Sequence, residues 1–418
     1  MKVLVLNTGS SSVKFRVFDT TNGQATDLAQ GLVERIGDAD ANVVCSESLE
    51  PAVADVAPMF SSATGGWDIP NHNGAIRVIC QMLMSDRCDV VEDLSEIAGI
   101  GHRVVHGGEE FCESTLIDDA VINGIEKCSK LAPLHNPPAL EGIRACATAF
   151  QGVPQVAVFD TAFHSTIPPK AYRYPLPAEL YFEHGVRKYG FHGTSHRYVS
   201  GEAIRLLKKP VEETRIITCH LGNGSSIAAV KGGKCVETSM GMTPLGGVMM
   251  GTRPGDLDPY LPLFMIKELG MTVDEVDRTL NKGSGLFGVC GDNDMRDIEK
   301  RAAEGCETCA LALEMFAYKI ARFIGSYAMV MGGCDAIVFT AGIGENDPTK
   351  RGHILENAGF LGCFVDEARN AANEVVISTD ESACKAFVIP TNEELVIACD
   401  TATLVGKSPA CRQTAVAD

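Results

Sequence analysis

The sequence predicts an α/β protein built from two similar domains, and three observations support this expectation. Short apolar runs of strand length alternate with longer stretches of helical pattern. A hairpin rich in glycine and serine opens the chain and returns near its midpoint, a spacing too long for a solenoid repeat. The 418 residues also suit two or three domains of roughly 150 residues each.

The first of these hairpins opens the chain. The apolar run Lys2 to Leu6 leads into the small polar residues Asn7 to Ser12, and the alternating stretch Val13 to Phe18 follows. We therefore expect a strand, a tight turn and a second strand. Residues 38–73 are rich in small residues and weakly periodic, so we interpret them as an excursion from the first domain and assign them no chemistry.

Helices and buried strands are expected in alternation along the rest of the chain. Helical patterns cover Glu141 to Phe150, Val273 to Leu280 and Ala302 to Met331. Strands are predicted over Gln155 to Phe159, Ile216 to His220, Ile227 to Val230, Ala336 to Thr340 and Lys385 to Ile389.

Charge and hydropathy exclude several classes of protein. The chain has 36 Lys and Arg against 54 Asp and Glu, a formal net charge of -18 without a long basic run, so nucleic acid and anionic membranes are poor partners. No apolar run approaches the ~18 residues that span a membrane. Because the first residues lack a signal-peptide pattern and the 16 cysteines have no regular spacing, we expect a reduced, cytoplasmic protein.

One cysteine pair has a spacing of its own. Cys306 and Cys309 form a C-x-x-C within a helical stretch, with no second pair or histidine nearby. A zinc or redox site is therefore the less favoured interpretation of this pair.

Three loops of glycine with small polar residues follow strand-like runs: Asn7 to Ser12, Gly222 to Ser226 and Gly342 to Asn346. Glycine lets backbone N–H groups surround an anion, so three such loops in one chain favour phosphate binding. The chain has no P-loop motif. A G-x-G-x-x-G match at Gly283 to Gly288 lacks a preceding strand, and we interpret it as a turn.

Histidine and arginine gather beside glycine in four segments that we expect to be turn-like: Gly101 to Gly108, Leu134 to Pro137, Phe191 to His196 and Gly251 to Asp256. Such residues donate hydrogen bonds to carboxylate and phosphate oxygens. Two carboxylates, Asp160 and Glu393, follow strand-like runs, where they could hold Mg²⁺ or orient a nucleophile. A histidine metal site is disfavoured because the usual ligand spacing is absent.

Seven motifs in order resemble the acetate kinase (acetokinase) family, which belongs to the superfamily of sugar kinases, heat-shock chaperones and actin. They are Asn7 to Lys14 (NTGSSSVK), Gly101 to Gly108 (GHRVVHGG), Phe191 to His196 (FHGTSH), His220 to Gly224 (HLGNG), Gly251 to Pro259 (GTRPGDLDP), Phe339 to Asn346 (FTAGIGEN) and Thr391 to Leu395 (TNEEL). The resemblance implies reversible, Mg²⁺-dependent phosphoryl transfer from ATP to acetate, giving acetyl phosphate and ADP, with Mn²⁺ as a possible substitute metal. It also implies a homodimer.

The resemblance implies a duplicated actin-like, ribonuclease H-like fold with two domains around a nucleotide cleft. The first domain is expected to hold residues 1–162 closed by 393–418, and the second, nucleotide-binding domain residues 163–392. Its implied catalytic residues are Asp160 (proton handling), His192 and Arg253 (transition-state stabilisation). Asn7 and Glu393 are the implied metal-linked residues.

Substrate and nucleotide residues are implied in the same way. The substrate set is Arg103, Val105, His135, Lys14, Ser10 and Ser12, and Val105 favours acetate over propionate. The nucleotide set is His220, Leu221, Gly222, Asn223, Gly224, Asp294, Met295, Arg296, Gly342, Ile343, Gly344, Glu345 and Asn346.

Two alternatives stay open at this point. A propionate or butyrate kinase would differ only in its acyl pocket. A non-catalytic nucleotide-binding switch would need no carboxylate pocket. Four residues together argue against it: Arg103, Arg253, His192 and Asp160. Asp292 and Asn293 replace the more usual serines of the family before Asp294, which leaves the preferred nucleotide open.

Overall fold

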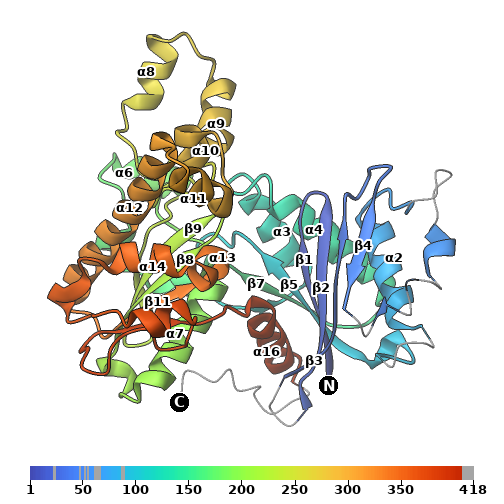
Figure 1. Cartoon of the computed structure of the whole chain (residues 1–418). Coiled ribbons are helices and arrows are strands. Elements are labelled where there is room, and N and C mark those ends of the chain that lie inside the picture. Colours follow the sequence, from blue (N-terminus) through green and yellow to red (C-terminus); the bar gives the residue numbers. More distant parts are fainter. Residues whose placement is uncertain are drawn as a thin grey trace. The chain divides into compact units, whose positions relative to one another are not determined.

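The computed structural model describes residues 1–418 except 22–24, 47–48, 51–52, 54–55, 61–66, 86–89 and 407–418. The described chain forms two compact units (Figure 1). The first holds Met1–Ala162 together with the C-terminal helix, and the second holds Phe163–Thr391. Residues 407–418 of the expected first domain, and part of the expected excursion 38–73, lie outside the described residues.

The first unit is built on a seven-stranded mixed sheet in the order β4-β3-β2-β1-β5-β7-β6. Its strands are β1 (Lys2–Thr8), β2 (Ser12–Asp19), β3 (Thr26–Glu34), β4 (Asn42–Cys45), β5 (Ile97–Val104), β6 (Thr115–Leu116) and β7 (Gln155–Phe159). Its helices are α2 (His72–Leu83), α3 (Asp119–Cys128), α4 (Asn136–Ala149) and α16 (Glu393–Val405), with 3-10 turns η2 (Ala57–Phe60) and η3 (Leu94–Glu96).

Helix α16 lies directly on β5 because two glycines of that strand leave room for it. A Cβ on Gly101 would stand 2.5 Å from both the Ile397 and the Thr401 side chains, and one on Gly99 would stand 3.0 Å from Val405. These glycines are therefore needed for the close approach of helix and strand. The contact brings the first turn of α16 to the end of the sheet where β5 and β7 finish.

The second unit is built on a five-stranded sheet in the order β10-β9-β8-β11-β12. Its strands are β8 (Arg215–Leu221), β9 (Ser225–Lys231), β10 (Lys234–Thr238), β11 (Ala336–Thr340) and β12 (Lys385–Val388). Its helices are α5 (Pro169–Tyr172), α6 (Ala178–His184), α7 (Gly193–Leu207), α8 (Leu261–Lys267), α9 (Val273–Lys282), α10 (Gly285–Cys290), α11 (Met295–Ala303), α12 (Glu307–Met331), α13 (Ala341–Asn346), α14 (Pro348–Leu355) and α15 (Glu367–Ala371), with 3-10 turns η4 (Ala162–Thr166), η5 (Val211–Glu213) and η6 (Ala358–Leu361). The long helix α12 buries Phe316, Ile320 and Ile324 along one face in the core of this unit.

The two sheets share one topology. In each, the first strand of the glycine hairpin pairs antiparallel with the second and parallel with a later strand, and that strand pairs parallel with the next. The order β3-β2-β1-β5-β7 of the first unit thus corresponds to β10-β9-β8-β11-β12 of the second. The duplicated α/β fold expected from the repeated hairpin is confirmed.

Three local predictions were wrong. The helix expected from Ala302 to Met331 is two helices, because the chain takes a left-handed turn at Gly305 (φ 95°) between α11 and α12. Residues Gly342 to Asn346 form most of α13 rather than a loop. The last four residues of the G-x-G-x-x-G segment belong to α10, so only its start is a turn.

None of the described helices is long and apolar enough to span a membrane. The cysteines of the described part of the chain are all free thiols.

Candidate active site

In the first unit, Arg103 and Asp160 form an ion pair at the end of two neighbouring parallel strands. Arg103 lies on β5, and Asp160 directly follows β7, with its backbone N–H donating to the carbonyl of Val104 at 2.9 Å. Arg103 Nε donates to both oxygens of the Asp160 carboxylate at 3.1 and 3.2 Å, and Nη2 donates to Oδ2 at 2.6 Å. Although burial opposes the charged form, the carboxylates of Asp160 and Glu393 raise the pKa of Arg103. The guanidinium is therefore fixed and positively charged.

Glu393 is the first residue of α16, and one of its carboxylate oxygens has no partner. Oε1 is buried and accepts no hydrogen bond. Burial raises the pKa of Glu393 to about 6, and the carboxylates of Asp160 and Glu394 add to the shift while Arg103 opposes it. A buried carboxylate oxygen without a donor is costly unless a cation satisfies it.

The hairpin residues Asn7 and Lys14 are cross-strand partners in β1 and β2, so their side chains share one face of the sheet. Lys14 Nζ is 2.5 Å from Oε1 of Glu394, the neighbour of Glu393. Burial would raise the pKa of Glu394, but the Lys14 ammonium lowers it overall. The chain thus brings an amide, an ammonium and two carboxylates to one end of the hairpin.

The remaining predicted substrate residues of this unit lie in the hairpin, just beyond β5 and at the start of α4. Ser10 is exposed in the hairpin turn, and Ser12 begins β2. Val105 is half-buried just beyond β5, and His135 is exposed at the N-terminal end of α4. The prediction that the Gly101–Gly108 segment is turn-like was wrong for His102, which lies inside β5 and has its pKa lowered to about 4 by burial.

In the second unit, a histidine network surrounds the second hairpin. His192 caps α7 in the left-handed region (φ 56°), and its Nδ1 is hydrogen-bonded to Ser226 Oγ at 2.9 Å. Its ring stacks on His220 with centroids 4.2 Å apart. His220 Nδ1 is hydrogen-bonded to Ser195 at 2.8 Å, and His196 to Ser226 at 2.6 Å. These contacts fix the orientation of the His192 ring.

Arg253 lies against the same hairpin. Its Nη1 donates to the carbonyl of Pro244 at 2.7 Å, and burial lowers its pKa. A Cβ on Gly224 would stand 2.6 Å from Nη2 of Arg253 and 3.7 Å from Cε1 of His192. Arg253 therefore packs directly on Gly224, and a side chain at that position would displace its guanidinium.

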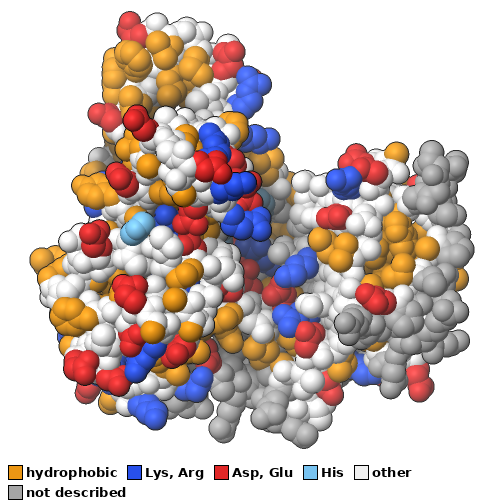
Figure 2. All heavy atoms as spheres, in the orientation of Figure 1, with side chains coloured by type: hydrophobic (Ala, Val, Ile, Leu, Met, Phe, Trp, Pro, Cys, Tyr) orange, Lys and Arg blue, Asp and Glu red, His pale blue; other side chains and the backbone are white. Residues whose placement is uncertain are grey.

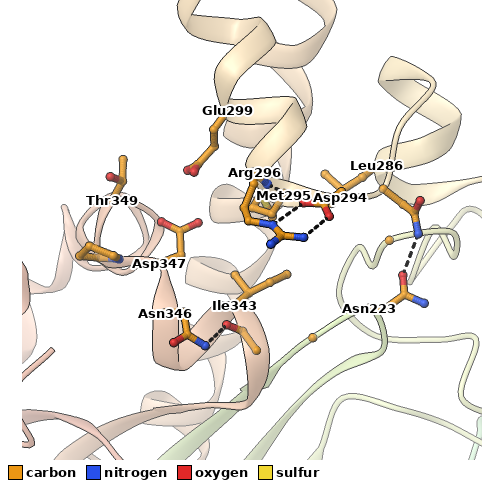
Figure 3. A pocket seen from close by; sticks show the side chains of 15 residues that line it. Asn223, Leu286, Asp294, Met295, Arg296, Glu299, Ile343, Asn346, Asp347 and Thr349 are labelled. Atoms are coloured by element: carbon orange, nitrogen blue, oxygen red, sulfur yellow. Dashed lines mark hydrogen bonds and ion pairs between the residues drawn. The ribbon is translucent and has the colours of Figure 1, made fainter. Parts of the chain in front are cut away.

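A pocket of about 490 Å³ opens beside this hairpin, a volume typical of small-molecule sites (Figure 3). Its walls come from the second hairpin, the start of α11, α13 and the start of α14. They are Gly222, Asn223, Gly251, Leu286, Asn293, Asp294, Met295, Arg296, Glu299, Gly342, Ile343, Asn346, Asp347, Pro348 and Thr349.

Eight of the predicted nucleotide residues line this pocket, and five do not. Leu221 is in the core, Gly344 packs on the backbone of Phe339, and Glu345 accepts the N–H groups of Ala341 and Thr391. His220 and Gly224 lie on the side of Arg253 and His192 instead.

Sequence reasoning missed Glu299 and Asp347, whose carboxylates point into the pocket (Figure 3). The fully buried Lys350 lies 3.5 Å from Glu299 Oε1. Burial raises the pKa of Glu299, and Asp347 adds to the shift. The only sequence signal was the Asp347-Pro348 pair, which is typical of a helix start.

We expect Lys350→Ala to lower the stability of the protein by about 3 kcal/mol, because it leaves two neighbouring carboxylates without their buried cation. Thermal unfolding measures this, with Lys300→Ala as the control because Lys300 is exposed on α11. An unfolding midpoint equal to that of the control would contradict the expectation.

Metal ligands are sparse. In the part of the chain that the structure describes, no group of three or more His, Cys, Asp and Glu side chains could hold a metal ion. Any divalent cation at Glu393 would thus need further oxygen ligands, such as amides, water or phosphates.

Known proteins are similar to this chain over nearly its whole length. The chain matches the acetokinase family over residues 2–399. It is 52% identical over 408 residues to an acetate kinase of Halothermothrix orenii, covering 97% of this chain and 100% of that protein. It is 50% identical to an acetate kinase of Methanosarcina thermophila, covering 97% of each.

Solved structures are similar over nearly the same length. A Porphyromonas gingivalis acetate kinase superposes with a TM-score of 0.87 at 42% identity, covering 97% of this chain and 99% of the other. A propionate kinase from Francisella tularensis gives a TM-score of 0.85 at 41% identity, covering 96% and 99%.

Proposed function

The chain belongs to the acetokinase family, and from this premise we propose how its own residues perform the family's reaction. The activity is that of an acetate kinase, which transfers a phosphoryl group between ATP and acetate. Two units with one topology each bring part of the machinery, and we propose that they are the two domains of the enzyme.

The electrostatics of the reaction explain the residue types. A carboxylate with an ordinary pKa of about 4 is already ionised at pH 7, so the nucleophile needs no general base. The obstacle is the approach of two anions. Fixed cations and hydrogen-bond donors aimed at the carboxylate and the transferring phosphoryl group lower that barrier.

Arg103 is our candidate for binding acetate. Its Nε and Nη2 are held by Asp160, and no hydrogen bond from Nη1 to another described residue occurs, so Nη1 can donate to the substrate. We assign Asp160 the role of positioning Arg103. A proton-handling role is less well supported, because ionised acetate releases no proton and both Asp160 oxygens accept from Arg103.

Arg253 and His192 are our candidates for stabilising the transferring phosphoryl group. Both are held by neighbouring residues, Arg253 by Pro244 and His192 by Ser226, and both lie against Gly224. Donors fixed before the reaction stabilise developing charge without reorganising.

Glu393 and Asn7 fit a magnesium site. The buried, unpartnered Oε1 of Glu393 is an observation that a bound cation would explain. Carboxylate and amide oxygens suit Mg²⁺ and Mn²⁺, and Mg²⁺ commonly takes one or two protein ligands and completes its shell with water and substrate phosphates. When bound, the ion would neutralise phosphate charge.

The 490 Å³ pocket is our candidate for the nucleoside of ATP or ADP. It combines apolar walls at Leu286 and Ile343 with polar groups from Asn223, Asn346 and Asp294. Such a mixture is typical of nucleotide sites. Because ATP is the donor and the described cysteines are free thiols, we place the reaction in the cytoplasm.

The observation that carries the proposal is the fixed Arg103–Asp160 pair beside Glu393. The test incubates the protein with ATP, Mg²⁺ and hydroxylamine over acetate, propionate or butyrate, and traps acyl phosphate as hydroxamate. We expect the highest kcat/KM with acetate. Measurable ATP binding without hydroxamate would instead support a non-catalytic switch.

Val105 controls the acyl chain in our proposal. We expect Val105→Ala to raise kcat/KM for propionate about tenfold relative to acetate, because the smaller side chain makes room for one methylene. Steady-state kinetics with both acids measure the ratio. The control is Val330→Ala, because Val330 is exposed on α12, whereas Val104, the neighbour of Val105, is in the core. An unchanged ratio in Val105→Ala would exclude this role.

We also propose a homodimer through the face that α8 presents. Figure 2 shows hydrophobic side chains gathered over this helix. The exposed apolar residues there are Tyr260, Leu261, Leu263, Phe264, Ile266, Leu269 and Val273. Apolar patches of this kind commonly mark self-complementary interfaces. Sedimentation is expected to give a dimer, and Leu263→Glu is expected to give monomers.

A further inference from the structure

The C-x-x-C segment lies at a place in the fold that suits thiol chemistry. Cys306 is the N-cap of α12, and Cys309 is the third residue of that helix. The turn at Gly305 ends α11 and directs the chain into α12 (Figure 1). Cys306 is half-buried and can be reached from solvent, whereas the Cys309 side chain is fully buried.

The two thiols lie one helical turn apart in sequence and differ in chemistry. The Cys306 thiol is hydrogen-bonded to the Thr308 hydroxyl, with 3.4 Å between Sγ and Oγ1. The Thr308 hydroxyl, followed by the thiol and backbone N–H of Cys309, lowers the pKa of Cys306 to about 7, with Arg301 contributing. Burial raises the pKa of Cys309 to about 11.

Cys80 and Cys128 illustrate the contrast with cysteines of the core. Burial raises the pKa of Cys80 to about 12 and that of Cys128 to about 11, which is typical of inert core thiols. In the described residues, no group of three or more His, Cys, Asp and Glu side chains that could hold a metal surrounds the pair. An accessible thiol at a helix N-terminus, three residues before a second, buried thiol, is the arrangement that favours disulfide exchange.

We propose that Cys306 and Cys309 are a redox-active dithiol that is oxidised by small disulfides of the glutathione disulfide class. The Cys306 thiolate attacks one sulfur of the small disulfide, forms a mixed disulfide and releases one thiolate. Cys309 then gives up its proton and attacks the Cys306 sulfur, which forms the Cys306–Cys309 bond and releases the second thiolate. The protein loses two electrons and two protons, and the small disulfide becomes two thiols.

The dithiol is connected to the candidate nucleotide pocket through Arg301. The charges that Cys309 and Cys306 carry when ionised raise the pKa of Arg301, and its Nη2 donates to the carbonyl of Cys290 at 3.3 Å. Its Nη1 lies 3.6 Å from Asp292, whose Oδ1 accepts the N–H groups of Asn293 and Asp294 at 2.7 and 3.0 Å. Oxidation removes the Cys306 thiolate and with it a negative charge beside Arg301. It is therefore expected to change how Arg301 holds Asp292, whose carboxylate positions the pocket residues Asn293 and Asp294.

The dithiol is tested by mapping its oxidation. The reduced protein is incubated with glutathione disulfide, quenched with acid, alkylated and digested with trypsin, and the peptide 302–319 carries both cysteines and no other. We expect a disulfide within this peptide in the parent protein. Cys309→Ser should instead stop at glutathione attached to Cys306, and Cys306→Ser should give neither product.

Serine at these positions keeps the size of the side chain, and serine is a favoured N-cap residue, so the variants are expected to fold and to keep the basal activity. Cys334→Ser, at another half-buried thiol, is the matched control and should still form the disulfide. Thiols that stay fully alkylatable, a mixed disulfide that persists in the parent protein, or a bond from Cys309 to Cys290 would each overturn the proposal.

The connection to the pocket rests on the proposed function and has its own measurement. We expect the oxidised parent protein to show a KM for ATP about fivefold higher than the reduced form, and Cys306→Ser to show no difference after the same treatment. Equal KM values in a protein with the mapped disulfide would overturn the connection alone. Failure of both forms to bind ATP would count against the nucleotide pocket itself and leave the dithiol mapping as it stands.

Discussion

Replacement of Arg253 by alanine is expected to lower kcat by about 10² to 10³, since removal of one fixed donor from a buried transition-state site commonly costs that much. The guanidinium is held by the Pro244 carbonyl and packs against Gly224, so it is fixed in position before the reaction. The KM for ATP should change less than kcat, because the proposed contact is made to the transferring group.

The measurement is steady-state acyl phosphate formation by the purified variant, with Arg278→Ala as the control. Arg278 is exposed on α9, and its loss should leave kcat within about twofold of the parent. Arg253→Lys adds a further comparison, because it keeps the charge without the planar fork and should recover only part of the activity. A kcat for Arg253→Ala within threefold of the parent would refute the assignment.

Glu393→Gln is expected to lower kcat/KM for Mg²⁺-ATP by at least about 10², because an amide cannot replace the charge of a carboxylate toward a divalent cation. The same variant should be the more stable protein at pH 7, since it removes a buried carboxylate whose Oε1 has no partner. Loss of activity together with a gain of stability separates a functional carboxylate from a structural one. A variant that loses both would indicate a structural role.

The pH dependence of that stability difference follows from the pKa of Glu393. It is raised from 4.5 to about 6 by burial, so the protonated form is favoured in the folded protein. The stabilising effect of protonation is fully present below pH 4.5 and is lost as the pH rises through 6. The unfolding midpoints of the parent and Glu393→Gln should therefore be close at pH 4.5 and diverge by pH 7, with the parent lower.

Local patterns predicted the sheets well because their strands are short, apolar and bounded by glycine turns. The predicted strands Gln155–Phe159 and Ala336–Thr340 have those bounds in the structure. The patterns failed where tertiary packing, rather than local composition, determines whether a segment is a loop or a helix. Gly342 to Asn346 has the composition of a loop, yet it continues from β11 through Ala341, a non-glycine residue with φ 64°, into α13.

The candidate site could be predicted in part for a related reason. Asp160 was singled out because it follows a predicted strand, and Arg103 because histidine and arginine gather beside glycine in its segment, and the structure joins the two in an ion pair. Glu299 and Lys350 gave no such signal, because their meeting depends on how α11 and α14 each pack against α12 in the folded unit. A pocket wall of this kind is a property of tertiary packing rather than of a motif.

The place of α16 in the sequence has a consequence for protein synthesis. This helix belongs to the first unit but follows Phe163–Thr391 of the second unit, so the first unit is completed only after those residues have been made. Until then, the apolar residues of β1 and β7 that pack against α16 lack their covering helix. Because Glu393 begins the same helix, the carboxylate proposed to bind the metal joins the first unit only at that stage.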